Sequence, residues 1–446
     1  MSVPDKDLVM KTSSSSSLQT VPSSGSMTVP SSLSLAAIVS SVASETDFEH
    51  KFNDLIQAGD NDGAKLLLEK ATKNTIAQEG PLPTESKSTI AFAFDIDGVF
   101  IRSTNRLENG PETIRMLQEL RIPFVFLTNG GTKTEEAHAA KLSSILGVDI
   151  EGKNFIQSHT PWLELVPKFK DRYILAVGGD GNDCREVAHA YGFEKVITPA
   201  DIMVAYPNVY PFSDITRYHS LARPLPDHSD ENPLQIAAIL VWSSPRDWGL
   251  DTQVIIDLVL SENGHLGTRA PTHGPFLPEN GLELHFSNAD YTYASDYHLP
   301  RFAQGAFASA LHGIISHQHG AQLVSTTIGK PTETTYLYAE KILHEYHHQI
   351  HAESGSQEPL PGIKTVYMVG DNPLSDIAGA NMYQSRYGSQ WKSILVETGV
   401  HVPGTTPAVC PTKVVKGVRE AVEWALAEDK REKEGTTMER DDYFSS

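Results

Sequence analysis

The chain has 446 residues, of which 39% are hydrophobic and 21% charged, so it is long enough for two or three domains with buried cores. Its 56 acidic residues outnumber its 36 basic residues, and the formal net charge of −20 argues against a nucleic-acid-binding protein, which needs a basic face. Two cysteines, Cys184 and Cys410, exclude a disulfide framework and a cysteine-based zinc motif, and no apolar run reaches the ~20 residues of an integral membrane segment.

The N-terminal region divides into two parts. Residues 1–45 are rich in Ser, Thr, Val and Pro, which predicts a disordered segment. Residues 46–87 are predicted to form a short helical segment and a linker, because apolar residues recur there at helical spacing. The start of the chain is Ser-rich like a mitochondrial transit peptide, but no arginine precedes Arg102, and it lacks the positive charge of a secretory signal.

Strands and helices alternate from residue 88 onward. The apolar run 89–94 predicts a strand buried on both faces, and 122–127 predicts a second strand. Helices are predicted over 111–120 and 134–146, the second ended by Gly147. This order predicts a doubly wound, mostly parallel, Rossmann-like α/β sheet, whose first part we assign to 88–158.

A second α/β region follows, which predicts an inserted domain over 159–300. Its expected elements are strands 173–177, 237–242 and 282–286, helices 183–191 and 251–262, and two Pro-rich irregular stretches at 207–233 and 268–280. The core is expected to resume over 301–427, before a charged tail at 428–446. Its expected elements are helix 303–317, strand 322–327, helix 332–349, strand 365–369, last strand 391–396 and last helix 414–427.

The first chemical motif is 95–99 (DIDGV), at the end of the first strand. Ligands of open α/β sheets bind outside the carboxyl ends of the strands. Asp95 is suited to attack phosphorus as a nucleophile, and Asp97 to protonate the leaving group and later deprotonate water. Gly98 permits the tight turn that brings both carboxylates to one pocket. The alternative is a turn that is Asp-rich without function.

The second motif is 127–131 (LTNGG), after the second strand. The Thr128 hydroxyl and the backbone N–H groups of Asn129 and Gly130 suit phosphate oxygens. The alternative is a simple Asn-Gly turn. Lys330, in 329–331 (GKP), is either a surface lysine or the charge that neutralises a bound phosphate and keeps the nucleophile ionised.

The last motif is 370–376 (GDNPLSD), after the strand at 365–369. Mg²⁺ prefers carboxylate and water oxygens, and Asp371 is the expected ligand, while Asp376 supports the site or orients Lys330. A helix cap is the alternative. Taken together, the motifs predict a magnesium site on Asp95, Asp97, Asp371 and Asp376 beside a phosphate site.

In this order, the four motifs resemble those of the haloacid dehalogenase superfamily, over residues 88–427. The resemblance implies that Asp95 is the nucleophile, Asp97 the general acid/base, Lys330 the catalytic lysine, and Mg²⁺ the cofactor. The insertion between the second and third motifs resembles class IIA members with a C2 cap. The segments 127–131, 299–302 and 368–373 resemble the branch named for the cat eye syndrome critical region, which implies a mitochondrial location, with the cytoplasm as the alternative. Many class IIA members have Asn-Asn where this chain has Asn129-Gly130.

The expected function is a phosphatase that hydrolyses a small phosphorylated metabolite through an aspartyl-phosphate. Dehalogenases lack an acid at the position of Asp97, because their leaving group needs no proton, so the phosphatase is favoured over them. Phosphoryl transfer to another acceptor and a non-catalytic scaffold are the alternatives.

Three further patterns receive structural interpretations. These are 344–348 (HEYHH), expected at a solvated helix end rather than as a zinc site, 177–181 (VGGDG), expected as a turn of the inserted domain, and 287–290 (SNAD), expected as the hinge returning to the core.

Overall fold

A computed structural model describes residues 88–229, 231–279, 281–293, 297, 299, 301–355 and 359–435. The disordered segment predicted for 1–45 and the helical segment and linker predicted for 46–87 lie outside these residues. In the part of the chain that is described, no helix combines the length and the apolar character needed to cross a membrane.

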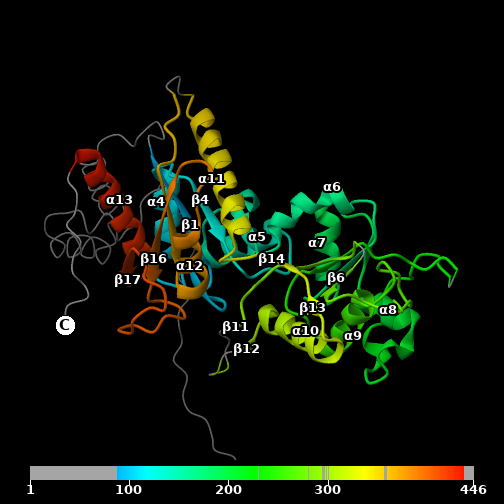
Figure 1. The fold of residues 1–446 in the computed structure, drawn as a ribbon. Coiled ribbons are helices and arrows are strands. Elements are labelled where there is room, and N and C mark those ends of the chain that lie inside the picture. Colours follow the sequence, from blue (N-terminus) through cyan, green and yellow to red (C-terminus); the bar gives the residue numbers. More distant parts are fainter. Residues whose placement is uncertain are drawn as a thin grey trace, which may run out of the picture. The chain divides into compact units, whose positions relative to one another are not determined.

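The core domain is built on a six-stranded parallel sheet with the strand order β17-β16-β15-β1-β4-β5 (Figure 1). All neighbouring pairs are parallel, which confirms the predicted doubly wound α/β core. The strands are β1 (Ile90–Phe94), β4 (Phe124–Leu127), β5 (Phe155–Ile156), β15 (Thr365–Gly370), β16 (Gln390–Val396) and β17 (Lys413–Val415).

Helices cover both faces of this sheet. Along β1 the large side chains of Phe92 and Phe94 point to one face, where α4, α5 and α13 pack, and the small Ala91 and Ala93 point to the other, where α11 and α12 pack. This alternation follows from the two-residue period of a strand. The helices are α4 (Gly110–Glu119), α5 (Glu135–Leu146), α11 (Glu333–Glu353), α12 (Ala378–Met382) and α13 (Val418–Glu434).

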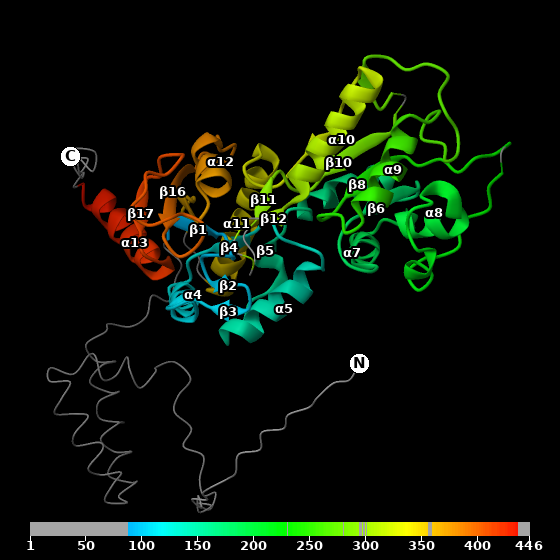
Figure 2. The ribbon, with the colours of Figure 1, turned by 90° about the horizontal axis from the view of Figure 1, so that it is seen from below.

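The inserted α/β cap domain has its own parallel sheet, with the strand order β14-β10-β8-β6-β7 (Figure 2). Helices again pack on both faces, α8, α9 and α10 on one and α6 and α7 on the other. The strands are β6 (Ile174–Val177), β7 (Val196–Ile197), β8 (Ala238–Val241), β10 (Glu283–Phe286) and β14 (Thr326–Thr327). The helices are α6 (Val166–Phe169), α7 (Asp183–Tyr191), α8 (Pro199–Ala205), α9 (Trp248–Val259) and α10 (Gln304–His319).

The return to the core lies later in the chain than the expected position at residue 301. Helix α10 packs Phe307, Leu311 and Ile315 into the cap core, and β14 pairs with β10 of the cap sheet. The strand expected over 322–327 is two short strands, β13 (Gln322–Leu323) and β14. The expectation was wrong because helical periodicity reveals an apolar face without revealing which sheet covers it.

Two further boundaries differ at the C-terminal end. The strand at 391–396 is not the last one, since β17 follows and extends the sheet beside β16. Helix α13 begins at Val418 and continues to Glu434, so the first part of the expected charged tail is helical. Oppositely charged residues at i and i+4, such as Asp429 and Lys433, are compatible with a helix on a solvated face.

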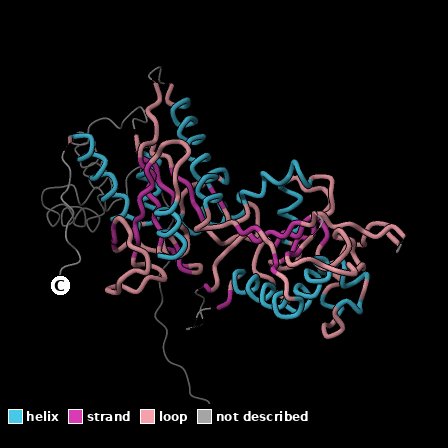
Figure 3. Tube along the Cα trace, in the orientation of Figure 1, coloured by secondary structure: helices cyan, strands magenta, loops and turns pink. Residues whose placement is uncertain are grey.

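The remaining elements are short and lie in the connections (Figure 3). The irregular stretch at 268–280 contributes β9 to a pair with β13, and β11 and β12 form an antiparallel hairpin that leaves the cap beside β10. The short elements are β2 (Ile101–Arg102), β3 (Asn105–Arg106), β9 (Phe276–Leu277), β11 (Thr292–Tyr293), β12 (Arg301–Phe302), the 3₁₀ helices η1 (Gly152–Asn154), η2 (Thr160–Leu165), η3 (Pro207–Val209) and η4 (Ile215–Arg217), and the π-helical turn η5 (Pro373–Ile377).

Candidate active site

Three carboxylates gather at the carboxyl edge of the core sheet. Asp95 follows β1, Asp371 follows β15, and Asp376 lies in η5 directly after it, and one oxygen from each lies within 4.8 Å of the others. Strands β1 and β15 are parallel neighbours, and the N–H of Asp95 donates to the carbonyl of Val369 at 2.9 Å. The shared strand edge therefore brings together side chains that are far apart in sequence.

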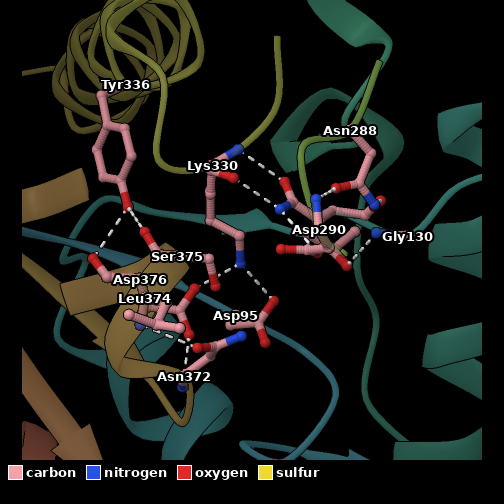
Figure 4. Close-up of polar contacts among 12 residues, drawn as sticks. Asp95, Gly130, Asn288, Asp290, Lys330, Tyr336, Asn372, Leu374, Ser375 and Asp376 are labelled. Atoms are coloured by element: carbon pink, nitrogen blue, oxygen red, sulfur yellow. Dashed lines mark hydrogen bonds and ion pairs between the residues drawn. The ribbon is translucent and has the colours of Figure 1, made fainter. Parts of the chain in front are cut away.

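Lys330 lies between two of these carboxylates (Figure 4). Its Nζ is 2.6 Å from Asp95 Oδ1 and 2.7 Å from Asp376 Oδ1, and only 2% of its side chain is exposed. When all three carboxylates are ionised, they and the one ammonium leave two negative charges on this cluster. Lys330 is therefore no surface lysine, and its charge neutralises part of the cluster.

The segment that carries Lys330 differs from the expected one. It does not follow a core strand, because the strand before it, β14, belongs to the cap sheet. The loop that returns from the cap to α11 carries it, and Gly329 adopts φ +90° there. A side chain at Gly329 would also come within 2.6 Å of the carbonyl oxygen of Ser287, so glycine is required on both grounds.

Mutual burial shifts the ionisation of the group. Burial raises the pKa of Asp95, and the attraction of Lys330 opposes that rise. For Lys330, burial alone would lower the pKa, but Asp376 and Asp95 outweigh it and raise the pKa, so the lysine stays protonated. Burial, followed by repulsion from Asp95 and Asp376, raises the pKa of Asp371. Such crowding of like charges is relieved when a cation binds among them.

The residues fit a divalent cation that prefers oxygen ligands. The donor set consists of carboxylates alone, as Mg²⁺ prefers, and the two excess negative charges match its charge. Within the set, Asp376 is already engaged at both oxygens, by Lys330 and by the N–H of Asn372 at 3.0 Å. Asp95 and Asp371 are therefore best suited to direct coordination, while Asp376 orients Lys330, which is one of the two roles expected for it.

Asp97 departs from the expectation that it is a metal ligand. Its side chain does not belong to the cluster of Asp95, Asp371 and Asp376, and the residue is exposed just before the turn at Gly98. Gly98 adopts φ +84°, and a side chain there would overlap the Asp371 carboxylate. Desolvation raises the pKa of Asp97, and Lys330 and Lys141 oppose the rise. A carboxyl group with a raised pKa beside the cluster suits the acid role instead.

The second motif lies beside Lys330 after β4. The N–H of Gly130 donates to Thr128 Oγ1 at 3.0 Å, so the hydroxyl of Thr128 acts as acceptor there and its own proton is available for another acceptor. The side chain of Asn129 is directed at protein groups, namely the backbone of Lys330 and the carboxylate of Asp290. Only the backbone of Asn129 is left for the expected role in phosphate binding.

Several supporting residues carry no recognisable sequence signal. Val400 donates its N–H to Asp371 Oδ2 at 2.6 Å, from a loop after β16. Tyr336 on α11 is fully buried and donates to the carbonyls of Ser375 and Asp376, which holds η5 in place (Figure 4). Asp290, expected only as part of a hinge, binds Asn129. These contacts join segments distant in sequence, and a single sequence does not reveal them.

Of the histidine-rich segment at 344–348 and the glycine-rich segment at 177–181, only the second has the structure predicted for it. The segment at 344–348 is not a solvated helix end, because α11 continues to Glu353 and His347 is buried on its core-facing side. Within the described residues, these histidines do not bring three ligand atoms within 4.8 Å, so they do not form a preassembled zinc site. The segment at 177–181 is a cap turn, as predicted, with Gly178, Gly179 and Gly181 at positive φ.

Comparisons with known proteins point to one family. The family described as haloacid dehalogenase-like hydrolase matches residues 92–194, and one described as HAD-hydrolase-like matches residues 327–421. A mitochondrial hydrolase of Saccharomyces cerevisiae is 38% identical over 355 residues, which cover 76% of this chain and 96% of that protein. A p-nitrophenyl phosphatase from Archaeoglobus fulgidus is 17% identical with a TM-score of 0.48, over 77% of this chain and 100% of that chain.

A further relative is a fusion of cardiolipin synthase (CMP-forming) with a mitochondrial hydrolase in Schizosaccharomyces pombe. It is 37% identical over 373 residues, which cover 83% of this chain and 57% of the fusion, so the chain spans little more than half of that protein. The two matched family segments carry Asp95, Lys330 and Asp371. The first segment extends into the cap through α7, and the rest of the cap lies between the two segments. With these motifs and a relative matched over nearly its whole length, the chain belongs to the haloacid dehalogenase-like hydrolases.

Proposed function

We propose that this chain is a Mg²⁺-dependent phosphatase that hydrolyses a small phosphorylated metabolite through an aspartyl-phosphate on Asp95. The observation that carries the proposal is the buried contact of Lys330 Nζ with Asp95 Oδ1 at 2.6 Å, within a group of three carboxylates. A carboxylate is a competent nucleophile toward phosphorus only when it is ionised and the anionic phosphoryl group is neutralised beside it. Lys330 serves both requirements at one position.

The first step forms the covalent intermediate. An oxygen of Asp95 attacks phosphorus, the bond from phosphorus to the leaving oxygen breaks, and that oxygen takes a proton from Asp97. The raised pKa of Asp97 supports this role, since it favours the protonated form that a general acid needs. In the second step the Asp97 carboxylate removes a proton from water, the water oxygen attacks phosphorus, and the bond to Asp95 breaks to release phosphate.

Binding of the phosphoryl group rests on charge and on fixed donors. Lys330, the Thr128 hydroxyl and the backbone N–H of Asn129 lie at the same strand edge and suit phosphate oxygens, while the N–H of Gly130 donates to Thr128 Oγ1. When bound, Mg²⁺ would add positive charge beside these oxygens, and Asp95 and Asp371 would hold it; their carboxylate oxygens within 4.8 Å of one another support this. Positioning and charge neutralisation supply most of the rate in phosphoryl transfer.

The cap supplies the surface that meets the leaving group. The β11–β12 hairpin begins two residues after Asp290. The aromatic side chains of Tyr291, next to it, and of Tyr293 and Phe302, within it, are 56%, 52% and 64% exposed. Exposed aromatic rings beside an active site favour a leaving group with an apolar face.

The two yeast relatives are named as mitochondrial hydrolases, which supports a mitochondrial location for this chain as well.

The proposal is tested by phosphate release from p-nitrophenyl phosphate with and without Mg²⁺. We expect Mg²⁺-dependent turnover and a loss of at least ~10³-fold in Asp95→Asn, because the amide is not a nucleophile. Acid quenching during turnover of a ³²P-labelled ester should trap label on the wild type and none on Asp95→Asn. Full activity in Asp95→Asn would refute the assignment.

The same assay separates the alternatives. Phosphoryl transfer to another acceptor predicts that an added alcohol or sugar receives label in place of water. A non-catalytic scaffold predicts that no ester in a broad panel of aryl, glycerol and sugar phosphates is hydrolysed. The intact set of Asp95, Asp97, Lys330 and Asp371 favours hydrolysis over the scaffold.

A further inference from the structure

The side chain of Asn129 forms hydrogen bonds with both the N–H and the carbonyl of Lys330. Its Oδ1 accepts from the N–H of Lys330 at 2.7 Å, and its Nδ2 donates to the carbonyl of the same residue at 2.9 Å. The side chain of Lys330 then spans the distance to Asp95 and Asp376. The position of the Nζ atom therefore depends on a clamp made by a residue of the second motif.

The second N–H of the Asn129 amide is used by the cap segment. Nδ2 also donates to Asp290 Oδ2 at 3.0 Å, across 161 residues of sequence. A reversed amide would set its donors against the N–H of Lys330 and its oxygen against both the Lys330 carbonyl and the Asp290 carboxylate. Asp290 thus strengthens the one orientation in which Asn129 can clamp Lys330.

Asp290 is itself held in place by the segment that leaves the cap sheet after β10. The N–H of Asp290 donates to Asn288 Oδ1 at 2.7 Å, and Asn288 Nδ2 donates to the carbonyl of Asn129 at 3.1 Å. The carbonyl of Asp290 accepts from the N–H of Gly305, at the start of α10, at 2.8 Å. Asp290 therefore belongs to the cap segment, whereas Asn129 belongs to the core.

We propose that Asp290 and Asn129 form a relay, meaning a chain of hydrogen bonds from Asp290 of the cap through Asn129 to the backbone of Lys330. Through this relay, the packing of the cap on the core positions Lys330 against the nucleophile Asp95. Asp290 and Asn129 are positioning residues, since they act through Lys330. The inference rests on the proposed function, in which Lys330 neutralises the phosphoryl group. Any shift of the β10 segment away from the core removes the acceptor of Asn129 and loosens the clamp on Lys330.

The relay also connects the leaving-group surface to the chemistry. Asp290 lies two residues before the β11–β12 hairpin, whose base is closed by the N–H of Ala303 donating to the carbonyl of Tyr291 at 2.9 Å. A leaving group that binds the hairpin and fixes its position would also fix the position of Asp290. Binding energy from the leaving group would then order the lysine that stabilises the transition state.

The test compares Asp290→Ala, Asp290→Asn, Asn129→Ala and the double alanine variant with the wild type. The matched control is Asp183→Asn, which weakens a different contact between cap and core, that of Asp183 with Lys133 at 3.2 Å. With p-nitrophenyl phosphate and saturating Mg²⁺, we expect Asp290→Ala to lose ~10–100-fold in kcat with KM within ~3-fold, as misplacement of a catalytic group does. Asp290→Asn keeps an acceptor oxygen and should recover most of the loss.

Two results separate a relay from a merely structural role. Since Asp290 acts through Asn129, the double variant should lose no more than Asn129→Ala alone. Amide hydrogen exchange at Lys330 should accelerate in Asp290→Ala and stay unchanged in the control, and this readout needs no turnover. If no substrate is hydrolysed by the wild type, the proposed function fails while exchange still judges the relay. Multiplicative losses in the double variant, an equal loss in Asp183→Asn, or wild-type exchange in Asp290→Ala would each overturn the relay.

Discussion

The backbone of Gly399 packs so closely against Asp371 that an added Cβ atom would overlap the carboxylate. The next residue, Val400, donates its N–H to Oδ2 of the same carboxylate at 2.6 Å. The loop after β16 therefore fixes the direction in which Asp371 faces the other acids. Gly399 has no reactive group, yet the geometry of the acidic cluster depends on it.

Replacement of Gly399 by alanine should displace the Asp371 carboxylate. Gly399 does not have a positive φ, so the effect would be steric rather than conformational. We expect a loss of ~10²-fold in kcat with weaker Mg²⁺ activation, measured by steady-state kinetics at varied Mg²⁺. The control Gly362→Ala has no atom within 4 Å of the new methyl group and should behave as wild type. Unchanged Mg²⁺ activation in Gly399→Ala would contradict this account.

Lys330→Met should abolish turnover and destabilise the fold. Removing the ammonium leaves Asp95 and Asp376 buried without their partner, which costs ~3–5 kcal/mol when the charges stay. The loss of a charge at the phosphoryl group should lower kcat by at least ~10²–10³-fold. Urea unfolding and kinetics measure the two effects. Lys168→Met, which removes an exposed pair with Glu283, should change stability by less than ~1 kcal/mol.

Mg²⁺ should stabilise the folded chain by binding to the cluster of Asp95, Asp371 and Asp376. Ligand binding to the folded state adds ~2.7 kcal/mol at a hundredfold excess over Kd, which appears as a rise in Tm. Asp371→Asn removes one ligand and part of the mutual repulsion, so it should raise the Tm of the metal-free protein and reduce the rise with Mg²⁺. Differential scanning fluorimetry with EDTA and with Mg²⁺ measures both. An equal Mg²⁺ response in wild type and variant would place the cation elsewhere.

Asp97→Asn should distinguish substrates by their leaving groups. A nitrophenolate leaves without a proton, whereas an alkoxide needs one from an acid. The loss in kcat/KM, which reports the first step, should therefore be at least ~10-fold larger for glycerol phosphate than for p-nitrophenyl phosphate. Glu283→Gln in the cap should affect both substrates equally, since that side chain pairs with Lys168. Equal losses in kcat/KM for the two substrates in Asp97→Asn would show that Asp97 is not the general acid.

Acid sensitivity should depend on His347. Burial, with the neighbouring His344, His348 and His351, lowers the pKa of His347 to about 4. The unfolded chain therefore takes up a proton near the ordinary pKa of ~6.5, before the folded chain does. The free energy of unfolding should fall between those two pH values, by up to ~1.4 kcal/mol per pH unit.

Urea unfolding from pH 7 to pH 4 measures this dependence. The variant His347→Gln cannot titrate, so the stability difference between wild type and variant should shrink as the pH falls. The control His317→Gln replaces an exposed histidine on α10 and should leave the profile unchanged. Parallel profiles for wild type and His347→Gln would show that His347 does not control acid sensitivity.

Much of the core could be predicted from residue patterns. The apolar runs that form β1, β4 and β15 carry no polar alternation, because each strand is buried on both faces. Asp95, Thr128 and Asp371 were placed at one edge because parallel strands end on the same side of a sheet. The cap boundary was wrong, because the apolar face of α10 fits either sheet and only the packing of Phe307 in the cap decides between them.

The sequence by itself determined which chemical groups follow the core strands and in which order, since residue type and local periodicity depend on near neighbours. Only the tertiary structure decided that Asp97 stands outside the carboxylate cluster, that Lys330 arrives from the cap, and that Asn129 meets Asp290 across 161 residues. The physical reason is that such contacts arise from the path of the chain through two sheets. Local propensity does not encode that path, because it is set by packing that many residues share.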